Sequence, residues 1–411
     1  MATPVQISTA LPEPSFESSP FQIGGNLYVP SINIGSGEIG IFTSSDSGST
    51  WSQLDAAHDP TQNATFFSCD TDGTNIYIAC SDVNNFLSVY VFDTITELWL
   101  NAGAPYESTF NNFTTIPKCA YSGGNLVVSC ETQISDFDFY AAFFDTSSLT
   151  WGSLFKLTTQ GSAAVDVTVI GIVAVTGAFL VAVEVQNQPG HPVLAPTIQY
   201  ATFSTPSTPS YTVIDTAASG ADTIYYNLVA QNGQVVLPWD LDFGGTDQMH
   251  VLISPIGNPT SVTIQDISPG AGSDPTFTQA VVGSTIYVFV WLTNTTGNLV
   301  VYESTGGTFG SPTQLLAASQ PTIAVASPAS STTTGWALAY GDVTGTFQLS
   351  FLPSGPVVSP ITKVIASGFG TVALANIGNI CRFSRPKSKR LLSPRPIVVG
   401  KEYTYPETYV R

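Results

Sequence analysis

Arginine is missing from the first 381 of the 411 residues of this sequence. That stretch holds only three lysines, Lys118, Lys156 and Lys363, against 27 acidic residues, for a net charge of −24. Because contacts to phosphates require cationic side chains, this part of the chain is not expected to bind nucleic acid. Charged residues make up only 10% of the whole chain, which favours an extracellular or virion-surface setting.

Helical periodicity is also missing over any long stretch, which indicates an all-β chain. The longest uncharged run lies between Asp166 and Glu184. It is rich in β-branched residues and is interrupted by Thr176-Gly177, so we expect a hairpin there and not a membrane span. The N-terminus has neither a basic segment nor an apolar core, and no classical signal peptide is expected.

Cysteine and histidine are scarce, with five and three residues. Cys69, Cys80, Cys119 and Cys130 form two pairs with equal spacing. A two-residue turn would place Cys69 opposite Ile76, so buried thiols are favoured over disulfides. No C-x-x-C pair is available for zinc, and the histidines have no paired spacing. The sequence predicts no cofactor, and it leaves a Ca²⁺ site at carboxylate-rich loops open.

A repeat dominates what is present. The stretch from Cys69 to Cys80 predicts two short strands joined by a tight Asp72-Gly73 turn, and the stretch from Cys119 to Cys130 repeats it. The second strand of this hairpin recurs every 44 to 56 residues, beginning at Asn26, Asn75, Asn125, Ala178, Gln234, Thr285 and Gly335, with a weaker copy at Asn379. A period near 50 with four strands per unit is typical of a β-propeller blade.

We therefore predict a single all-β domain over residues 1–384, a β-propeller of seven to eight four-stranded blades. The segment 5–9 resembles the outermost strand of a blade and is expected to close the ring. Eight of the 11 Lys and Arg residues lie in 382–411, which carries a net charge of +6. Residues 385–411 form a basic, proline-containing tail with three open interpretations: completion of the last blade, an anchor for assembly, or a nucleic-acid or targeting element.

One motif carries a resemblance. Ser44, Asp46, Gly48, Thr50 and Trp51 follow the pattern S-x-D-x-G-x-T-W, which resembles the Asp box of sialidase-like (BNR-type) propellers. The resemblance implies a structural role in the turn between the third and fourth strands, where the aspartate accepts backbone N–H bonds. Weaker analogues pair an aspartate with a tryptophan six residues later and also resemble kelch repeats: Asp93 with Trp99, and Asp145 with Trp151.

The resemblance to sialidases would imply hydrolysis of sialosides, for which that family uses three arginines to bind the substrate carboxylate. Residues 1–381 contain no arginine, and three lysines do not replace planar, bidentate guanidinium groups. The sequence therefore excludes a sialidase mechanism. The same absence counts against the six-bladed fucose lectins, which also use an arginine in each site.

Acidic and aromatic residues gather where the loops between second and third strands are expected, on the face where propellers usually bind ligands. These candidate ligand-binding residues are Trp239, Asp240, Asp242, Asp247, Asp136, Asp138, Trp291 and Tyr340. Three interpretations stay open: solvated carboxylates with packing aromatics, a carbohydrate site with aromatic platforms, or a glycosidase with two aspartates as acid and base.

The sequence favours a non-catalytic recognition or structural protein that binds a carbohydrate or a protein partner through this loop face. The first alternative is a glycoside hydrolase other than a sialidase, with paired aspartates. The second is a structural component of a virion or its tail, assembled as a homo- or hetero-oligomer through residues 385–411. No catalytic residue is assigned.

Overall fold

We analysed a computed structural model of the chain. It describes residues 20–32, 39–46, 50–54, 67–81, 86–109, 117–131, 138–159, 165–187, 195–217, 222–225, 227–243, 246–268, 275–292, 298–316, 330–332, 335–341, 346–353 and 361–366.

The described strands form seven antiparallel sheets, and the four main strands of each sheet follow one another in chain order. The first sheet contains β1 (Phe21–Ile23), β2 (Asn26–Ile32), β3 (Ile39–Ser44) and β4 (Ser52–Gln53). The second contains β5 (Phe67–Thr71), β6 (Asn75–Ser81), β7 (Leu87–Asp93), β8 (Leu98–Trp99) and, after the 3₁₀ turn η1 (Leu100–Gly103), β9 (Tyr106–Glu107). The third contains β10 (Lys118–Ser122), β11 (Asn125–Glu131), β12 (Phe139–Asp145), β13 (Thr150–Trp151) and β14 (Phe155–Lys156).

The fourth sheet contains β15 (Val165–Val175), β16 (Ala178–Asn187), β17 (Thr197–Phe203) and β18 (Thr212–Thr216). The fifth contains β19 (Asp222–Tyr225), β20 (Val229–Gln231), β21 (Gln234–Phe243), β22 (Thr246–Pro255) and β23 (Thr263–Ile267). The sixth contains β24 (Pro275–Val282), β25 (Thr285–Leu292), β26 (Leu299–Thr305) and β27 (Thr313–Leu316). The seventh contains β28 (Ser330–Thr332), β29 (Gly335–Gly341), β30 (Thr346–Pro353) and β31 (Ile361–Ala366). Three further strands pair beside the path of the four main strands: β9 with β7, β14 with β12, and β20 with β21.

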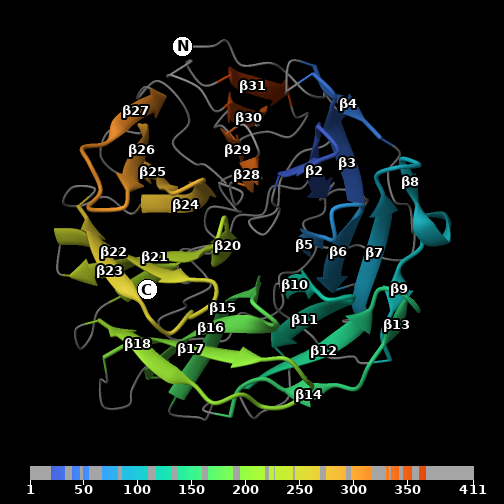
Figure 1. Cartoon of the computed structure of the whole chain (residues 1–411), viewed down its shortest axis with the longest axis horizontal. Helices are drawn as coiled ribbons and strands as arrows, with labels where there is room; N and C mark the ends of the chain where they lie inside the picture. The colour runs from blue at the N-terminus through green and yellow to red at the C-terminus, as the bar shows by residue number, and fades with distance from the viewer. Residues whose placement is uncertain are drawn as a thin grey trace, which may run out of the picture.

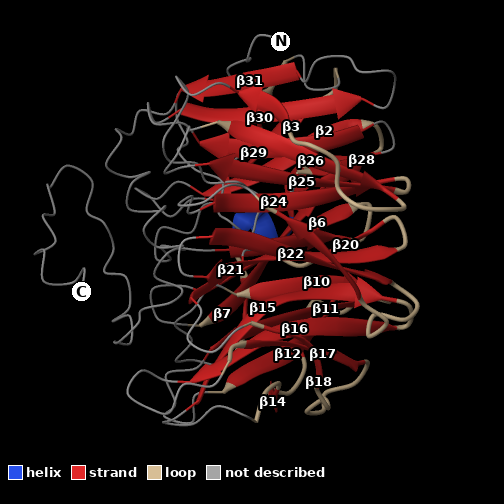
Figure 2. Cartoon of the chain, turned by 90° about the vertical axis from the view of Figure 1, so that its left-hand side faces the viewer, coloured by secondary structure: helices blue, strands red, loops and turns tan. Residues whose placement is uncertain are grey.

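The sheets are arranged around a common centre as the blades of a β-propeller (Figure 1). The innermost strands lie side by side from one sheet to the next: β5 lies beside β10, β10 beside β15, and β28 beside both β24 and β1. In the fifth sheet, β20 takes this place and lies beside β15 and β24. In the side view, most of the described turns lie on one face, at the right (Figure 2).

The structure confirms the predicted all-β propeller with four-stranded blades. The seven second strands β2, β6, β11, β16, β21, β25 and β29 begin at the residues predicted from the repeat. The structure describes the side-chain burial of six blades, and for the seventh sheet it describes the strands alone. The predicted count of seven to eight blades is therefore not shown and stays a prediction. The predicted eighth copy near Asn379, the closing segment 5–9, and the boundary between residues 384 and 385 lie outside the described residues.

The hairpin predicted between Asp166 and Glu184 is present as β15 and β16, which pair across Thr176-Gly177. Within the described ranges, no helix is long and apolar enough to cross a membrane. The turn after β5, however, differs from the prediction. Thr71 pairs with Ile76, and Cys69 lies opposite Ile78.

The shift has a local cause. The carboxylate of Asp72 accepts the backbone N–H groups of Thr74 (2.7 Å) and Asn75 (2.6 Å), which makes Asp72 the residue before the turn. Gly73 then takes the left-handed conformation, with φ of 88°.

A blade packs against a neighbouring blade on each side. Because successive side chains of a strand point to opposite faces, the inner strands contribute to the cores on both sides. In β6, Ile76 and Ile78 pack against the first sheet, whereas Tyr77 and Ala79 pack against the third. The four cysteines Cys69, Cys80, Cys119 and Cys130 are buried in these cores between sheets.

Candidate functional site

The predicted ligand-binding residues of the fifth blade do not lie in a loop. Trp239 and Asp240 belong to β21, which pairs with β22 as far as Phe243 and Thr246, with Asp242 opposite Asp247. The predicted loop is wrong at this point because the two strands continue their ladder through it. Trp239 is fully buried and Asp240 is 1% exposed, so this ring is not an open stacking platform.

The indole N–H of Trp239 donates to Oδ2 of Asp215 on β18 in the fourth sheet, at 2.8 Å. The same oxygen lies 2.6 Å from Nδ1 of His250. Nε2 of His250 lies 3.5 Å from Oδ1 of Asp266 on β23. These groups join the fourth and fifth sheets. We call Trp239, Asp215, His250 and Asp266 the blade clasp.

Asp138 is also buried, with 2% of its surface exposed. Its Oδ2 lies 2.8 Å from the ammonium group of Lys156, and its Oδ1 accepts the hydroxyl of Thr158 at 2.8 Å. These bonds occupy both oxygens within the third sheet. Asp136, the neighbouring candidate, lies outside the described residues.

For the last two candidates, Trp291 and Tyr340, the structure gives the strand and the residue paired with each. Trp291 lies in β25 opposite Leu299, and Tyr340 lies in β29 opposite Gln348. The seven candidates that the structure describes are thus spread over the third, fifth, sixth and seventh blades. Those whose side chains are described form no common pocket.

Described residues of the motif that resembles an Asp box are bonded to one another. Asp46 accepts the backbone N–H of Thr50 at 2.6 Å, the hydroxyl of Thr50 at 2.8 Å and the hydroxyl of Ser44 at 2.8 Å. Trp51 follows directly, partly buried, whereas Gly48 lies outside the described residues. Asp93 and Asp145 form similar turns between third and fourth strands, accepting backbone N–H groups two residues later at 2.8 Å.

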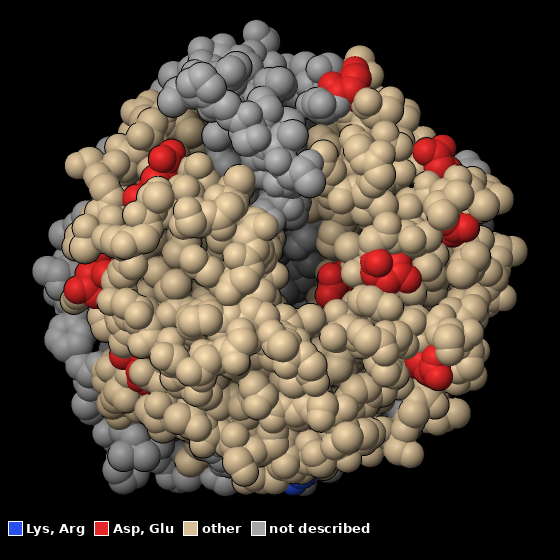
Figure 3. Space-filling model, in the orientation of Figure 1, with Lys and Arg blue, Asp and Glu red and all other residues tan. Residues whose placement is uncertain are grey.

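A cavity at the centre of the propeller is a second candidate site. It measures about 340 Å³, within the range of small-molecule sites. Residues of β1, β5, β10, β15 and β20 line it, so five innermost strands contribute. Figure 3 shows a hollow near the centre of the molecule, with acidic side chains on its right-hand side. The polar lining includes Gln22, Asp70, Lys118, Tyr121, Asn227 and Gln231.

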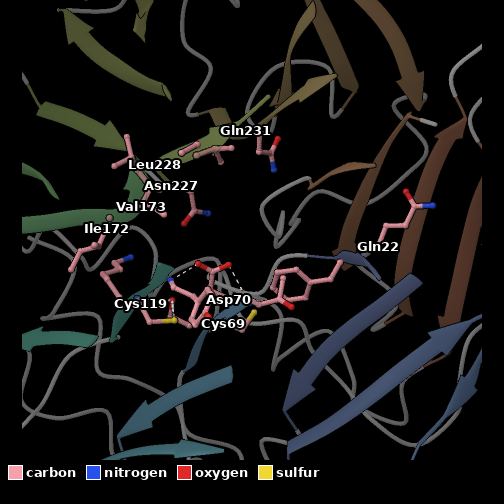
Figure 4. A pocket seen from close by; sticks show the side chains of 18 residues that line it. Gln22, Cys69, Asp70, Cys119, Ile172, Val173, Asn227, Leu228 and Gln231 are labelled. Atoms are coloured by element: carbon pink, nitrogen blue, oxygen red, sulfur yellow. Dashed lines mark hydrogen bonds between the residues drawn. The ribbon is translucent and has the colours of Figure 1, made fainter. Parts of the chain in front are cut away.

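Asp70 is the acidic residue among the described lining residues. Its Oδ2 accepts the backbone N–H of Tyr121 from the neighbouring sheet at 2.7 Å, and its Oδ1 accepts that of Thr71 at 2.8 Å. Burial raises its pKa to about 6, although both hydrogen bonds oppose the shift. Figure 4 shows this carboxyl group facing the open space between Cys69, Cys119 and Asn227.

Bonds between sheets hold the opposite wall. The side-chain amide of Gln279 on β24 donates to the carbonyl oxygens of Asn227 (2.6 Å) and Val236 (3.1 Å). Gln231 accepts the backbone N–H of Val281 at 2.9 Å. Because these bonds run from the fifth sheet to the sixth, the wall that carries Asn227 and Gln231 is held in place.

Tyr121 is held on the near wall. Its ring stacks on Tyr77, with centroids 5.5 Å apart and planes 10° apart. The hydroxyl of Tyr77 donates to Oδ2 of Asp72 at 2.7 Å. Burial, followed by this bond to a carboxylate, raises the pKa of Tyr77, which keeps the hydroxyl protonated at neutral pH.

This cavity was not predicted from the sequence, because the ligand-binding residues were expected in loops between second and third strands and not on first strands. One signal was available: Lys118 is one of three lysines in the first 381 residues, and it precedes Cys119 in the repeated hairpin. Chemically, the cavity offers amides, a hydroxyl, an ammonium group and one titratable carboxyl. Among the described residues, no cluster of three or more His, Cys, Asp or Glu side chains could hold a metal ion.

No family model matches the sequence, and no curated protein matches it. Solved structures match in fold. A polysaccharide lyase, ulvan lyase, is 11% identical with a TM-score of 0.55, covering 91% of this chain and 98% of that chain. A prolyl endopeptidase is 11% identical with a TM-score of 0.51, covering 85% of this chain. The present chain spans about half (50%) of that protein's length.

The lectin of Aleuria aurantia, a six-bladed β-propeller, is 14% identical with a TM-score of 0.42, covering 76% of this chain and 96% of that chain. At these identities the likeness is one of fold. The lectin, with its lower TM-score, supports no further argument. The neighbours thus include a lyase, a peptidase and a lectin.

Proposed function

We propose that this protein is a non-catalytic recognition propeller that binds a carbohydrate in its central cavity. The observation that carries the proposal is the polar lining of the cavity, contributed by five innermost strands. The ligand site predicted on the loop face is replaced by this cavity in the proposal, because Trp239, Asp240 and Asp138 are buried, and Trp239 and Asp138 are bonded to neighbouring side chains.

The chemistry of the lining suits sugar hydroxyl groups. Amide side chains such as Asn227 and Gln231 combine donors and acceptors on one group, as hydroxyl groups do. Asp70 accepts when ionised and donates when protonated, and its pKa of about 6 makes both forms accessible near neutral pH. Apolar residues such as Ile172 and Leu228 complete the wall for the C–H faces of a ring.

The fold likeness supports the proposal indirectly. The ulvan lyase structure of TM-score 0.55 contains a bound -[GlcA(1-4)Rha3S]- ligand. A propeller of similar architecture therefore presents a surface that accommodates a glycan. For the present chain, the class of sugar is left to experiment.

A glycan array with the full chain tests the proposal, followed by calorimetry on each hit with D70N and with N227A. We expect binding to weaken at least about tenfold in either variant, since one well-placed hydrogen bond to a charged or buried group accounts for that much. Glu303→Gln, an exposed change on β26, is the matched control and should bind as the wild type does. Absence of any glycan hit, or wild-type affinity in both cavity variants, would reject the proposal.

A second candidate is acid–base catalysis on a glycan. The raised pKa of Asp70 favours it, because a carboxyl group that titrates near pH 6 serves as a general acid. A hydrolase needs a second carboxyl group across the bond, and among the described lining residues Asp70 is the acidic one. Chromatography of array hits after incubation at pH 5 to 7 separates the two functions: product that D70N fails to form would establish the enzyme.

A further inference from the structure

A second concave site lies away from the centre, between the outer strands of the second and third sheets. It measures about 430 Å³ and is lined by residues 105–107, 109 and 149–152. Its walls are β9, which pairs with β7, and β13, which pairs with β12. We call it the inter-blade groove. It shares no lining residue with the central cavity.

Two aromatic rings of the groove are held rigidly. The indole N–H of Trp151 donates to the carbonyl oxygen of Tyr106 at 2.9 Å, joining the two sheets. Both rings pack on Phe144: the Trp151 centroid lies 5.2 Å away at 64°, and the Tyr106 centroid lies 5.8 Å away at 51°. Because both rings are partly exposed and already ordered, a ligand that stacks on them loses little side-chain entropy.

Polar groups stand beside these rings. Glu107, Thr109 and Thr150 are exposed and line the groove. The hydroxyl of Thr150 is paired with that of Ser148 at 2.7 Å, and the turn that carries it is held by bonds from Ser147 and Ser148 to Asp145. No lysine or arginine lines the groove among the described residues, which disfavours phosphate or sulfate as a ligand.

We infer that the inter-blade groove is a second carbohydrate subsite, which takes one neutral pyranose ring. The inference extends the proposed function and rests on it for the ligand class. The apolar face of the sugar stacks on Trp151 and Tyr106, and its hydroxyl groups donate to Glu107 and exchange hydrogen bonds with Thr150. An aromatic wall beside a carboxylate and hydroxyl groups fits a ligand with one apolar face and a polar rim.

The equivalent position of the second sheet is built differently. Trp99 packs on Phe92 (5.1 Å, 69°) as Trp151 packs on Phe144, but the first sheet contributes Leu54 to that junction where the second sheet contributes Tyr106. Trp99 therefore provides a matched control. It has the same type of ring, the same place in its blade and a similar partner, but it does not line the groove.

Saturation-transfer NMR and tryptophan fluorescence, using methyl glycosides of glucose, galactose, mannose, fucose and N-acetylglucosamine as probes, test the subsite. We expect at least one probe to bind the full chain, and Glu107→Gln and Trp151→Phe each to weaken that binding about fivefold or more. Trp99→Phe and Glu303→Gln should leave it unchanged. Glu107 is exposed, so its variant keeps the test valid even if Trp151→Phe destabilises the fold.

D70N separates this inference from the proposed central site. Binding that D70N abolishes and that both groove variants leave intact would overturn the groove subsite while keeping the cavity. Binding lost in the groove variants and intact in D70N would establish the groove and reject the cavity. Two binding events, one weakened by D70N and the other weakened by the two groove variants, would establish both sites. No binding of any probe would overturn the groove subsite, and the glycan array would then decide on the cavity alone.

Discussion

At the scale of single residues, Asp70 shows how the architecture changes the chemistry of a side chain. In the isolated hairpin it is one acidic residue in a run of Asp and Thr. In the folded chain a second sheet donates the N–H of Tyr121 to it and removes water from its surroundings. A group with a pKa shifted by burial in a cavity is a sound candidate for function.

Stability should depend on the protonation of Asp70. Its pKa rises from 3.8 to about 6 on folding, so the folded state holds the proton more tightly than the unfolded state. The contribution of Asp70 to stability is therefore largest below pH 4 and falls as pH rises to about 6, by at most about 3 kcal/mol. Urea midpoints between pH 4 and pH 7 should show a flatter profile for D70N. An equal slope in both proteins would contradict this origin.

Gly171 offers a second test at this scale. It follows a register shift in β15, and a Cβ atom there would lie 2.8 Å from Cβ of Leu228 and 3.3 Å from its backbone nitrogen. Gly171→Ala should therefore cost about 1 to 3 kcal/mol by forcing the fourth and fifth sheets apart. Gly257→Ala is the control, since its nearest atom, Oγ1 of Thr176, is 3.9 Å away. Equal melting temperatures for the two variants would refute the packing argument.

At the scale of elements, the blades are joined by cores and by a few polar bonds. In the blade clasp, Asp215 accepts a hydrogen bond from Trp239 and is bonded to His250 through the same oxygen. Burial lowers the pKa of His250, but its bond to Asp215 and the charges of Asp215 and Asp266 outweigh this and raise it above 6.5. For Asp215, burial raises the pKa, but the hydrogen bonds from His250 and from its other donors outweigh burial and lower the pKa overall.

The blade clasp should make stability depend on pH. The contribution of His250 is fully present below pH 6.5 and is lost as pH rises through its raised pKa. The contribution of Asp215 is present above pH 3.8 and is lost as pH falls through its lowered pKa. His250→Gln should therefore cost about 1 to 3 kcal/mol near pH 5.5 and less at pH 8.5.

Thermal melts at the two pH values check this prediction, with Asp266→Asn as the control. Asp266 is 61% exposed and 3.5 Å from the ring, so its loss should cost little. A penalty for His250→Gln that is the same at pH 5.5 and pH 8.5 would show that the imidazole acts by packing alone.

At the scale of the whole molecule, charge is divided along the chain. Residues 1–381 carry −24 and residues 382–411 carry +6. A basic segment on an acidic protein is attracted to the body of its own or another copy, over distances set by the salt concentration. This attraction supports the interpretation of residues 385–411 as an anchor for assembly.

Deleting residues 385–411 removes seven basic and two acidic residues and changes the net charge from −18 to −23. If the tail joins copies, light scattering at low salt should give a larger particle for the full chain than for the truncated one. Roughly 1 M NaCl should abolish the difference, because it shortens the screening length to about 3 Å. A monomeric full chain at low salt would argue against the anchor.

Much of the fold was predictable because its signals are local. A turn residue followed by alternating apolar residues marks each second strand, and seven such strands begin where the repeat predicted. The predicted turn after β5 was wrong by one residue. Asp72 lies before the turn, and its carboxylate accepts the backbone N–H groups of Thr74 and Asn75. The length of β21 was missed because aspartates in its last residues suggest a loop.

The candidate site was far less predictable. Trp239 and Asp240 have the composition of a binding loop, yet the packing of two sheets buries both. Asp70 and Gln231 drew no attention, because nothing within ten residues of either marks it as facing a cavity.

The sequence by itself determined the repeating unit, its period and the absence of arginine from residues 1–381, since each depends on residue types and short spacings. Only the tertiary structure decided which side chains meet. Asp70 binds Tyr121 at a separation of 51 residues, and Gln231 binds Val281 at a separation of 50, one blade apart in each case. The physical reason is that stacking of sheets brings together first strands one period apart, and no local pattern encodes which of their residues then face the centre.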